Sequence, residues 1–135
     1  MTIRQTTPPE AYETLQREPG TVYLDVRTPE EFAAGHPAGA VNVPVLFFRG
    51  GQSTPNADFV ATVRRLVPPE TPVLVGCQAG GRSQRGAELL VAAGYRDVSN
   101  VRGGFGGARD ETGRLVIPGW RDAGLPIETG AGGKS

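Results

Sequence analysis

Short apolar runs alternate with helical patterns along the first hundred residues, and this alternation limits the possible folds more than any other feature. Residues 22–26 and 72–76 are rich in β-branched and other apolar residues and end at turn residues. Continuous apolar runs of this length are typical of strands covered on both faces, as in a parallel sheet. Weaker strand patterns occupy residues 40–43 and 97–101.

Helical patterns fill the intervals between these strands. One begins at residues 7–10, and another begins at Thr28, where Pro29 and Glu31 have the spacing of a capping box. A third, residues 56–67, ends before Pro68 and places on one face Phe59, Val60, Val63, Leu66 and Val67.

A fourth helical pattern has Ser83 as its predicted N-cap and ends at Gly94. Strands and helices therefore alternate along the chain. This order predicts an α/β domain with a mostly parallel sheet.

The length and composition suit one packed domain. The chain has 135 residues, too few for two separate cores. Its 20 glycines and 12 prolines approach the content that suggests disorder, but the formal net charge is zero and 38% of residues are hydrophobic. We expect a domain over residues 1–127, with a long loop after residue 103, a short helix near 118–123 and a flexible tail at 128–135.

Charge and cysteine content argue against several classes of protein. The zero net charge does not suit a protein that binds nucleic acid by neutralising phosphates. Cys77 is the single cysteine and His36 the single histidine, so neither an internal disulfide nor a structural zinc site is expected. No segment approaches the roughly 18 apolar residues of a membrane span. We expect a soluble cytoplasmic protein without a metal and without a membrane partner.

The most informative segment joins residues 72–76 to the fourth helix. Cys77 follows the strand directly, and Gly80 and Gly81 come just before the helix. Ligands of parallel sheets bind outside the carboxyl ends of the strands. Glycines allow successive N–H groups to form an anion-binding nest, and the helix adds the positive end of its dipole. These groups, with Arg82 and Arg85, favour a thiolate, so Cys77 is a candidate nucleophile.

A cysteine after an apolar run is also typical of a small buried core residue. The glycine-rich loop favours the nucleophile instead, because a core cysteine does not require amides around it. Only residues 78–81 separate Cys77 from Arg82, one residue fewer than in the signature loop of cysteine phosphatases. The shorter loop suits an anionic sulfur species better than a phosphoryl group.

The sequence resembles the single-domain rhodanese family of sulfurtransferases over nearly its whole length. The resemblance rests on five groups of residues in the family's order and spacing: 23–27 with 30–32, 35–44, 77–83, 103–105, and 119–120 with 124–126. It implies a three-layer α/β/α sandwich around a five-stranded, mostly parallel sheet. It also implies that Cys77 accepts a sulfane sulfur from thiosulfate or a related anionic donor. The resulting persulfide passes its sulfur to cyanide in vitro or to a thiol or protein acceptor, without a cofactor.

The resemblance also assigns roles around Cys77. The substrate-binding loop comprises Gln78, Ala79, Gly80, Gly81, Arg82 and Ser83, and its amides stabilise the sulfur anion. Arg27 either attracts anionic donors or forms a structural pair, and for Asp25 we favour the structural role. We expect His36 in a structural turn rather than as a general base, and Trp120 as a packing anchor for the last helix.

The chain departs from the family pattern at two places. Residues 37–39 are Pro-Ala-Gly where the family often has Ile-Pro-Gly. Ala108 occupies the usual position of the tryptophan, and Trp120 follows 12 residues later. The additional residues, 106–119, form either a solvated loop or a segment near the catalytic loop that shapes access of a donor or partner. Residues 46–48 pack beside the site or, if exposed, mark a partner surface.

Two other functions stay open at this point. A rhodanese fold also suits a non-catalytic binding or regulatory module, although the complete loop around Cys77 argues against it. The short loop disfavours a cysteine phosphatase or arsenate reductase. The sequence does not predict an oligomeric state.

Overall fold

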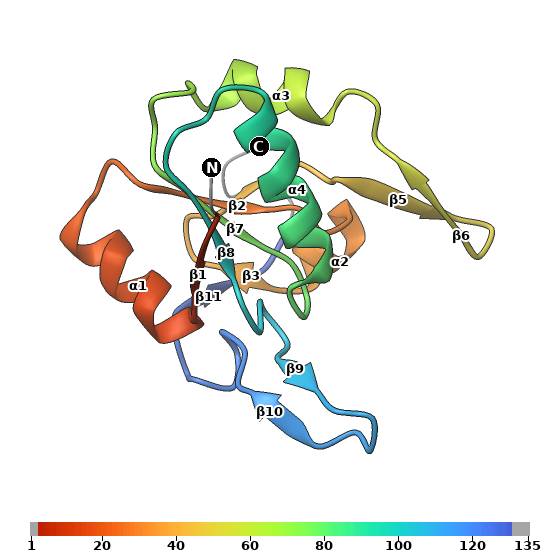
Figure 1. Ribbon diagram of the computed structural model, residues 1–135. Helices are drawn as coiled ribbons and strands as arrows, with labels where there is room; N and C mark the ends of the chain where they lie inside the picture. The colour runs from red at the N-terminus through yellow and green to blue at the C-terminus, as the bar shows by residue number, and fades with distance from the viewer. Residues whose placement is uncertain (1–2, 131–135) are drawn as a thin grey trace.

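A parallel sheet of five strands forms the centre of the computed structural model, which describes residues 3–130 (Figure 1). The strands lie in the order β1 (Arg4–Thr6), β8 (Val98–Val101), β7 (Val73–Gly76), β2 (Val22–Asp25) and β4 (Val41–Asn42). All four neighbouring pairs are parallel, which confirms the predicted sheet. The edge strand β1 was not predicted, because its residues are polar and exposed or half-buried.

Helices cover both faces of the sheet and complete the expected three layers. Helices α1 (Pro8–Arg17) and α2 (Pro29–Ala34) pack on the core cluster that contains Tyr23 and Leu74. Helices α3 (Phe59–Leu66) and α4 (Gly81–Ala92) pack on the cluster that contains Leu24 and Val75. Tyr23 and Leu24 in β2 face opposite sides of the sheet, as do Leu74 and Val75 in β7, because side chains alternate along a strand. Within residues 3–130, no helix is long and apolar enough to cross a membrane.

The helix boundaries agree with the sequence in part. The capping box at the start of α2 is confirmed, since the Glu31 carboxylate accepts from the Thr28 N–H and the Glu31 N–H donates to the Thr28 hydroxyl. Helix α3 begins at Phe59 rather than near residue 56, and an Asx turn in which Asn56 accepts from the Asp58 N–H precedes it. Leu66 is largely exposed, so the apolar face of α3 is narrower than predicted.

Two antiparallel hairpins project from the body of the domain (Figure 1). The first pairs β5 (Leu46–Arg49) with β6 (Gln52–Pro55), and Gly50 and Gly51 form its turn with φ of +58° and +78°. This hairpin was missed, although two glycines between strand patterns are a known hairpin signal. The second pairs β9 (Ala108–Arg109) with β10 (Leu115–Ile117), within the segment expected to be a loop.

The predicted short helix near residues 118–123 is wrong. A turn occupies this place, because the N–H groups of Trp120 and Arg121 donate to the carbonyls of Gly104 and Phe105. Trp120 is buried and packs edge to face on Tyr12 and Tyr23, so it anchors this turn rather than a helix.

The chain then forms a short strand, β11 (Ile127–Glu128), which pairs with β3 (His36–Pro37). The expected tail, residues 128–135, therefore starts inside a paired strand. Residues 131–135 lie outside the described residues.

Candidate active site

Cys77 lies at the carboxyl end of β7, beside the carboxyl end of β2. Asp25 and Gly76 are register partners, and the Val26 N–H donates to the Gly76 carbonyl at 2.9 Å. Gly76 is required here, since a Cβ at this position would lie 2.0 Å from the Tyr23 hydroxyl oxygen. Burial raises the pKa of Tyr23 well above its usual value. Tyr23 therefore places a neutral hydroxyl under the start of the Cys77 loop.

The Cys77 sulfur accepts a main-chain hydrogen bond from its own loop. The Gly80 N–H donates to Sγ at 3.0 Å. Gly80 has φ of +129° and is the N-cap of α4, so the sulfur lies at the amino end of a helix of 12 residues. A main-chain N–H and the positive end of a helix dipole therefore face the sulfur, in the arrangement that the glycine-rich loop predicts.

The structure corrects the expected role of Ser83 as N-cap. Ser83 lies inside the first turn of α4 and is fully buried. Its hydroxyl is 3.1 Å from the Gly80 carbonyl oxygen and also contacts the Asn100 side chain of β8. Ser83 therefore holds the loop against the sheet instead of capping the helix with its side chain.

Residues 103–106, here called the backing segment, hold the Cys77 loop from the opposite side. Three N–H groups of this segment donate to consecutive carbonyls of the loop: Phe105 to Cys77 at 2.8 Å, Gly106 to Gln78 at 2.9 Å, and Gly103 to Ala79 at 3.0 Å. Gly104 has φ of +51°, and a Cβ there would lie 2.1 Å from the Cys77 carbonyl oxygen. The sequence pointed to these glycines but not to their role, which depends on contacts between distant segments.

Arg27 is a buried link between four parts of the site. Its guanidinium donates to both Asp25 carboxylate oxygens, with the shortest distance 2.7 Å, and to the Gly35 carbonyl at 2.7 Å. It also donates to the Gln78 side chain at 3.3 Å and lies 4.6 Å from the centre of the Phe105 ring. With its guanidinium committed to these partners, Arg27 suits the structural role expected for Asp25 better than capture of a donor.

His36 lies in β3 and takes part in packing. Its ring is fully buried, stacks on Phe32 at 3.5 Å and places Nδ1 2.7 Å from the Phe32 carbonyl oxygen. Nε2 lies 3.7 Å from a carboxylate oxygen of Glu128 in the neighbouring strand β11. These contacts agree with a structural turn.

Arg82 forms a bidentate ion pair with Glu31 of α2. The guanidinium nitrogens lie 2.6 and 2.9 Å from the two carboxylate oxygens. Burial raises the pKa of Glu31, but hydrogen bonds from Arg82 and Thr28 outweigh burial and lower it to about 2. The sequence identified Glu31 only as a capping residue and missed this pair. Arg85, the other expected cation, is exposed and lies 3.9 Å from Glu88.

A cavity of about 380 Å³ borders Arg82 on the side of the first hairpin. Leu46, Phe59 and Leu89 contribute apolar side chains to its wall. Phe48 is 56% exposed, and its ring centre lies 5.4 Å from the Arg82 guanidinium carbon. Leu46 thus packs beside the site as expected, whereas Phe48 is exposed next to it, and a partner surface here stays a prediction.

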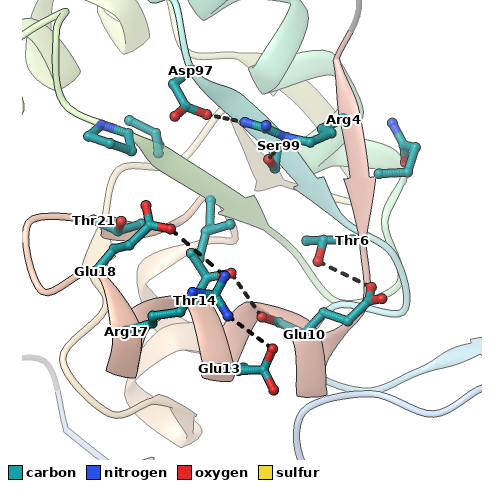
Figure 2. A pocket seen from close by; sticks show the side chains of 14 residues that line it. Arg4, Thr6, Glu10, Glu13, Thr14, Arg17, Glu18, Thr21, Asp97 and Ser99 are labelled. Atoms are coloured by element: carbon teal, nitrogen blue, oxygen red, sulfur yellow. Dashed lines mark hydrogen bonds and ion pairs between the residues drawn. The ribbon is translucent and has the colours of Figure 1, made fainter.

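A second cavity, of about 500 Å³, lies at the amino ends of the strands (Figure 2). Arg4, Arg17, Glu13 and Asp97 are among its lining residues. Cys77 is not among them, so this cavity is separate from the candidate site.

Comparison with known proteins agrees with the fold. The family model of the rhodanese-like domain matches residues 7–111. The chain belongs to the rhodanese-like domain family. A crystal structure of Rv0390 from M. tuberculosis shares the rhodanese fold seen here, with a TM-score of 0.81 and 33% identity, over 96% of this chain and 100% of that one.

Several relatives of this rhodanese-like chain are named for an activity. Thiosulfate sulfurtransferase GlpE of Haemophilus influenzae is 32% identical over 96% of this chain and 98% of its own length. Thiosulfate sulfurtransferase 16, chloroplastic, of Arabidopsis thaliana is 42% identical over 64% of this chain and 72% of its own length. The chain spans about half the length of several other plant relatives. These names support an activity of the sulfurtransferase type.

Proposed function

We propose that the protein transfers a sulfane sulfur from thiosulfate or a related persulfide donor to a thiol acceptor through a persulfide on Cys77. Cyanide serves as acceptor in vitro. The observation that carries this proposal is the Gly80 N–H, 3.0 Å from Sγ at the start of α4. A donor group in this place stabilises both the attacking thiolate and the persulfide anion that replaces it.

The reaction has two displacement steps. The Cys77 thiolate attacks the outer sulfur of thiosulfate, a new S–S bond forms, and sulfite leaves with the electron pair of the broken S–S bond. An acceptor thiolate or cyanide then attacks the outer sulfur of the persulfide and restores the Cys77 thiolate. The chain has no second cysteine, so the acceptor must come from outside. No cofactor takes part, and the cytoplasm supplies reduced thiols as acceptors.

Other residues of the loop bind and position the sulfur. The amides of residues 78–82 hold the sulfur anion, while Ser83 fixes the loop to β8 through Asn100. Asp25 and Arg27 fix the loop through Gln78. His36 supports the neighbouring turn and does not move a proton in either step.

The mass of the intact protein tests this proposal. After incubation with thiosulfate and removal of free donor, we expect a gain of one sulfur atom that disappears on adding cyanide. Cys77→Ser, the matched control, gains nothing, because it lacks the sulfur nucleophile. If the unmodified chain gains no sulfur from thiosulfate or an organic persulfide at any concentration, the proposal fails and a non-catalytic rhodanese-like module is favoured.

We further propose that residues 1–127 work as one rhodanese-like domain in which the 106–119 insertion shapes access to the loop. Ile117 of β10 and Gly80 of the Cys77 loop line the same cavity of about 280 Å³. Replacing residues 109–115 by a two-residue turn should change the rate with a protein acceptor more than the rate with cyanide. If the replacement leaves both rates unchanged, or changes both by the same factor, this role is contradicted.

A further inference from the structure

The positive charge of Arg82 is already neutralised by the Glu31 carboxylate before any donor binds. Arg82 provides the only cationic side chain within residues 77–83, and both of its terminal nitrogens contact Glu31. Glu31 is itself fixed, since its carboxylate also accepts from the Thr28 N–H at the start of α2. The pair is partly buried, with 18% of the Arg82 side chain and 30% of the Glu31 side chain exposed.

We propose that Glu31 is a specificity-determining residue that lowers the preference of the site for a dianionic donor relative to a monoanionic one. This inference rests on the proposed function. Thiosulfate brings two negative charges to the Cys77 loop, whereas an aryl thiosulfonate brings one and transfers the same kind of outer sulfur. The free energy of repulsion by a carboxylate beside the loop is about twice as large for the dianion as for the monoanion.

Arg82 lies in the first turn of α4, and the amino end of this helix faces the Cys77 sulfur through the Gly80 N–H. The Glu31 hydrogen bonds contribute most to the raised pKa of Arg82, and the charge of Cys77 also contributes. Glu31 therefore competes directly with an incoming anion for the same guanidinium. Removing the carboxylate charge leaves Arg82 free to face the donor.

Both donors react by the same balanced step, which makes their ratio informative. The Cys77 thiolate attacks the outer sulfur, and either sulfite or an aryl sulfinate leaves with the electron pair of the broken bond. A change in the reactivity of Cys77 itself alters both rates equally and cancels in the ratio. Only a change in the response to donor charge alters the ratio of the two kcat/KM values.

The test compares Glu31→Gln with Glu30→Gln. Gln at residue 31 can keep the capping bond to Thr28. Glu30 is the matched control, because it is the preceding residue of α2, is exposed, and loses the same charge when replaced. At low salt we expect Glu31→Gln to raise kcat/KM about ninefold for thiosulfate and about threefold for the thiosulfonate, mainly through KM, with smaller gains at high salt.

Glu30→Gln should change the ratio of the two values by much less. Arg82→Met should lower the rate with thiosulfate, and adding Glu31→Gln to it should restore less than Glu31→Gln gains alone. An unchanged ratio in Glu31→Gln, or an equal loss with both donors, would overturn the inference while leaving the Cys77 persulfide intact. Failure of the unmodified chain to gain sulfur from either donor would instead overturn the proposed function.

Discussion

Arginines are paired with carboxylates at both ends of the parallel sheet, but the pairs differ in how much of their side chains is exposed. At the carboxyl end, the Arg27 and Asp25 side chains are 3% and 2% exposed. At the amino end, Arg17 and Glu13 are 59% and 75% exposed, and they line the open cavity of Figure 2. Buried pairs fix the shape of their surroundings, because breaking one leaves an uncompensated charge, whereas exposed pairs contribute little.

The comparison shows that cavity size does not locate the candidate site. The cavity at the amino end is larger than the two that border Arg82 and Gly80, yet its charges belong to side chains on the surface of α1 and the edge of the sheet. At the carboxyl end, the backing segment fixes main-chain carbonyls of the Cys77 loop, and Arg27 holds the Gln78 side chain. Fixed amides are suited to hold a charge that appears during a reaction, because they need no rearrangement when it forms.

The largest effect is expected from Arg27→Met. This substitution leaves the Asp25 carboxylate buried without its partner and removes the link to Gln78, so the free energy of unfolding should fall by about 4 kcal/mol. Urea denaturation measures this change. The double variant Asp25→Asn with Arg27→Met should lose clearly less than the sum of the two single variants. Simple additivity would mean that the pair does not act as a unit.

The second effect concerns the backing segment. Gly104→Ala brings a Cβ against the Cys77 carbonyl and should cost about 3 kcal/mol of stability together with most of the sulfur transfer. The control is Gly113→Ala, at a residue that also has positive φ, +87°, but has nothing within 4 Å of an added Cβ. It should cost only about 1 kcal/mol and leave transfer unchanged. Equal losses in both variants would show that backbone strain, rather than support of the Cys77 loop, explains the result.

A smaller effect should appear in the pH dependence of stability. The pKa of Glu31 is lowered to about 2 in the folded state from 4.5, so its contribution is complete above pH 4.5 and is lost as the pH falls toward 2. The free energy of unfolding of Glu31→Gln should therefore lie below that of the unmodified chain by about 1 kcal/mol at pH 6. This gap should narrow steadily at pH 4 and pH 3 in urea denaturation. A gap that stays constant would show that the Glu31 charge does not contribute.

The sequence predicts features that depend on neighbouring residues better than features that depend on contacts between distant segments. The strands β2 and β7 and the Cys77 loop are local patterns, so apolar runs and glycines predict them directly. Ser83 has the residue type of an N-cap, but the loop closes on Gly80, whose φ of +129° suits only glycine. The backing segment and the Arg82–Glu31 pair join residues far apart in the chain, and no local pattern predicts such contacts. The edge strand β1 is polar and becomes a strand only because β8 offers it a partner.

The smallest effect is expected at the amino end, from Arg4→Ala. Arg4 pairs with Asp97 at the edge of the sheet, where both side chains are largely exposed, so the free energy of unfolding should fall by less than about 0.5 kcal/mol. Sulfur transfer from thiosulfate should be unchanged, because the pair lies at the opposite end of the strands from Cys77. Arg82→Ala provides the matched comparison, since it also removes one arginine from an ion pair but lies beside the loop. If Arg4→Ala slowed transfer as much as Arg82→Ala, the two ends of the sheet would be coupled, and the rigid carboxyl end alone would not account for the chemistry.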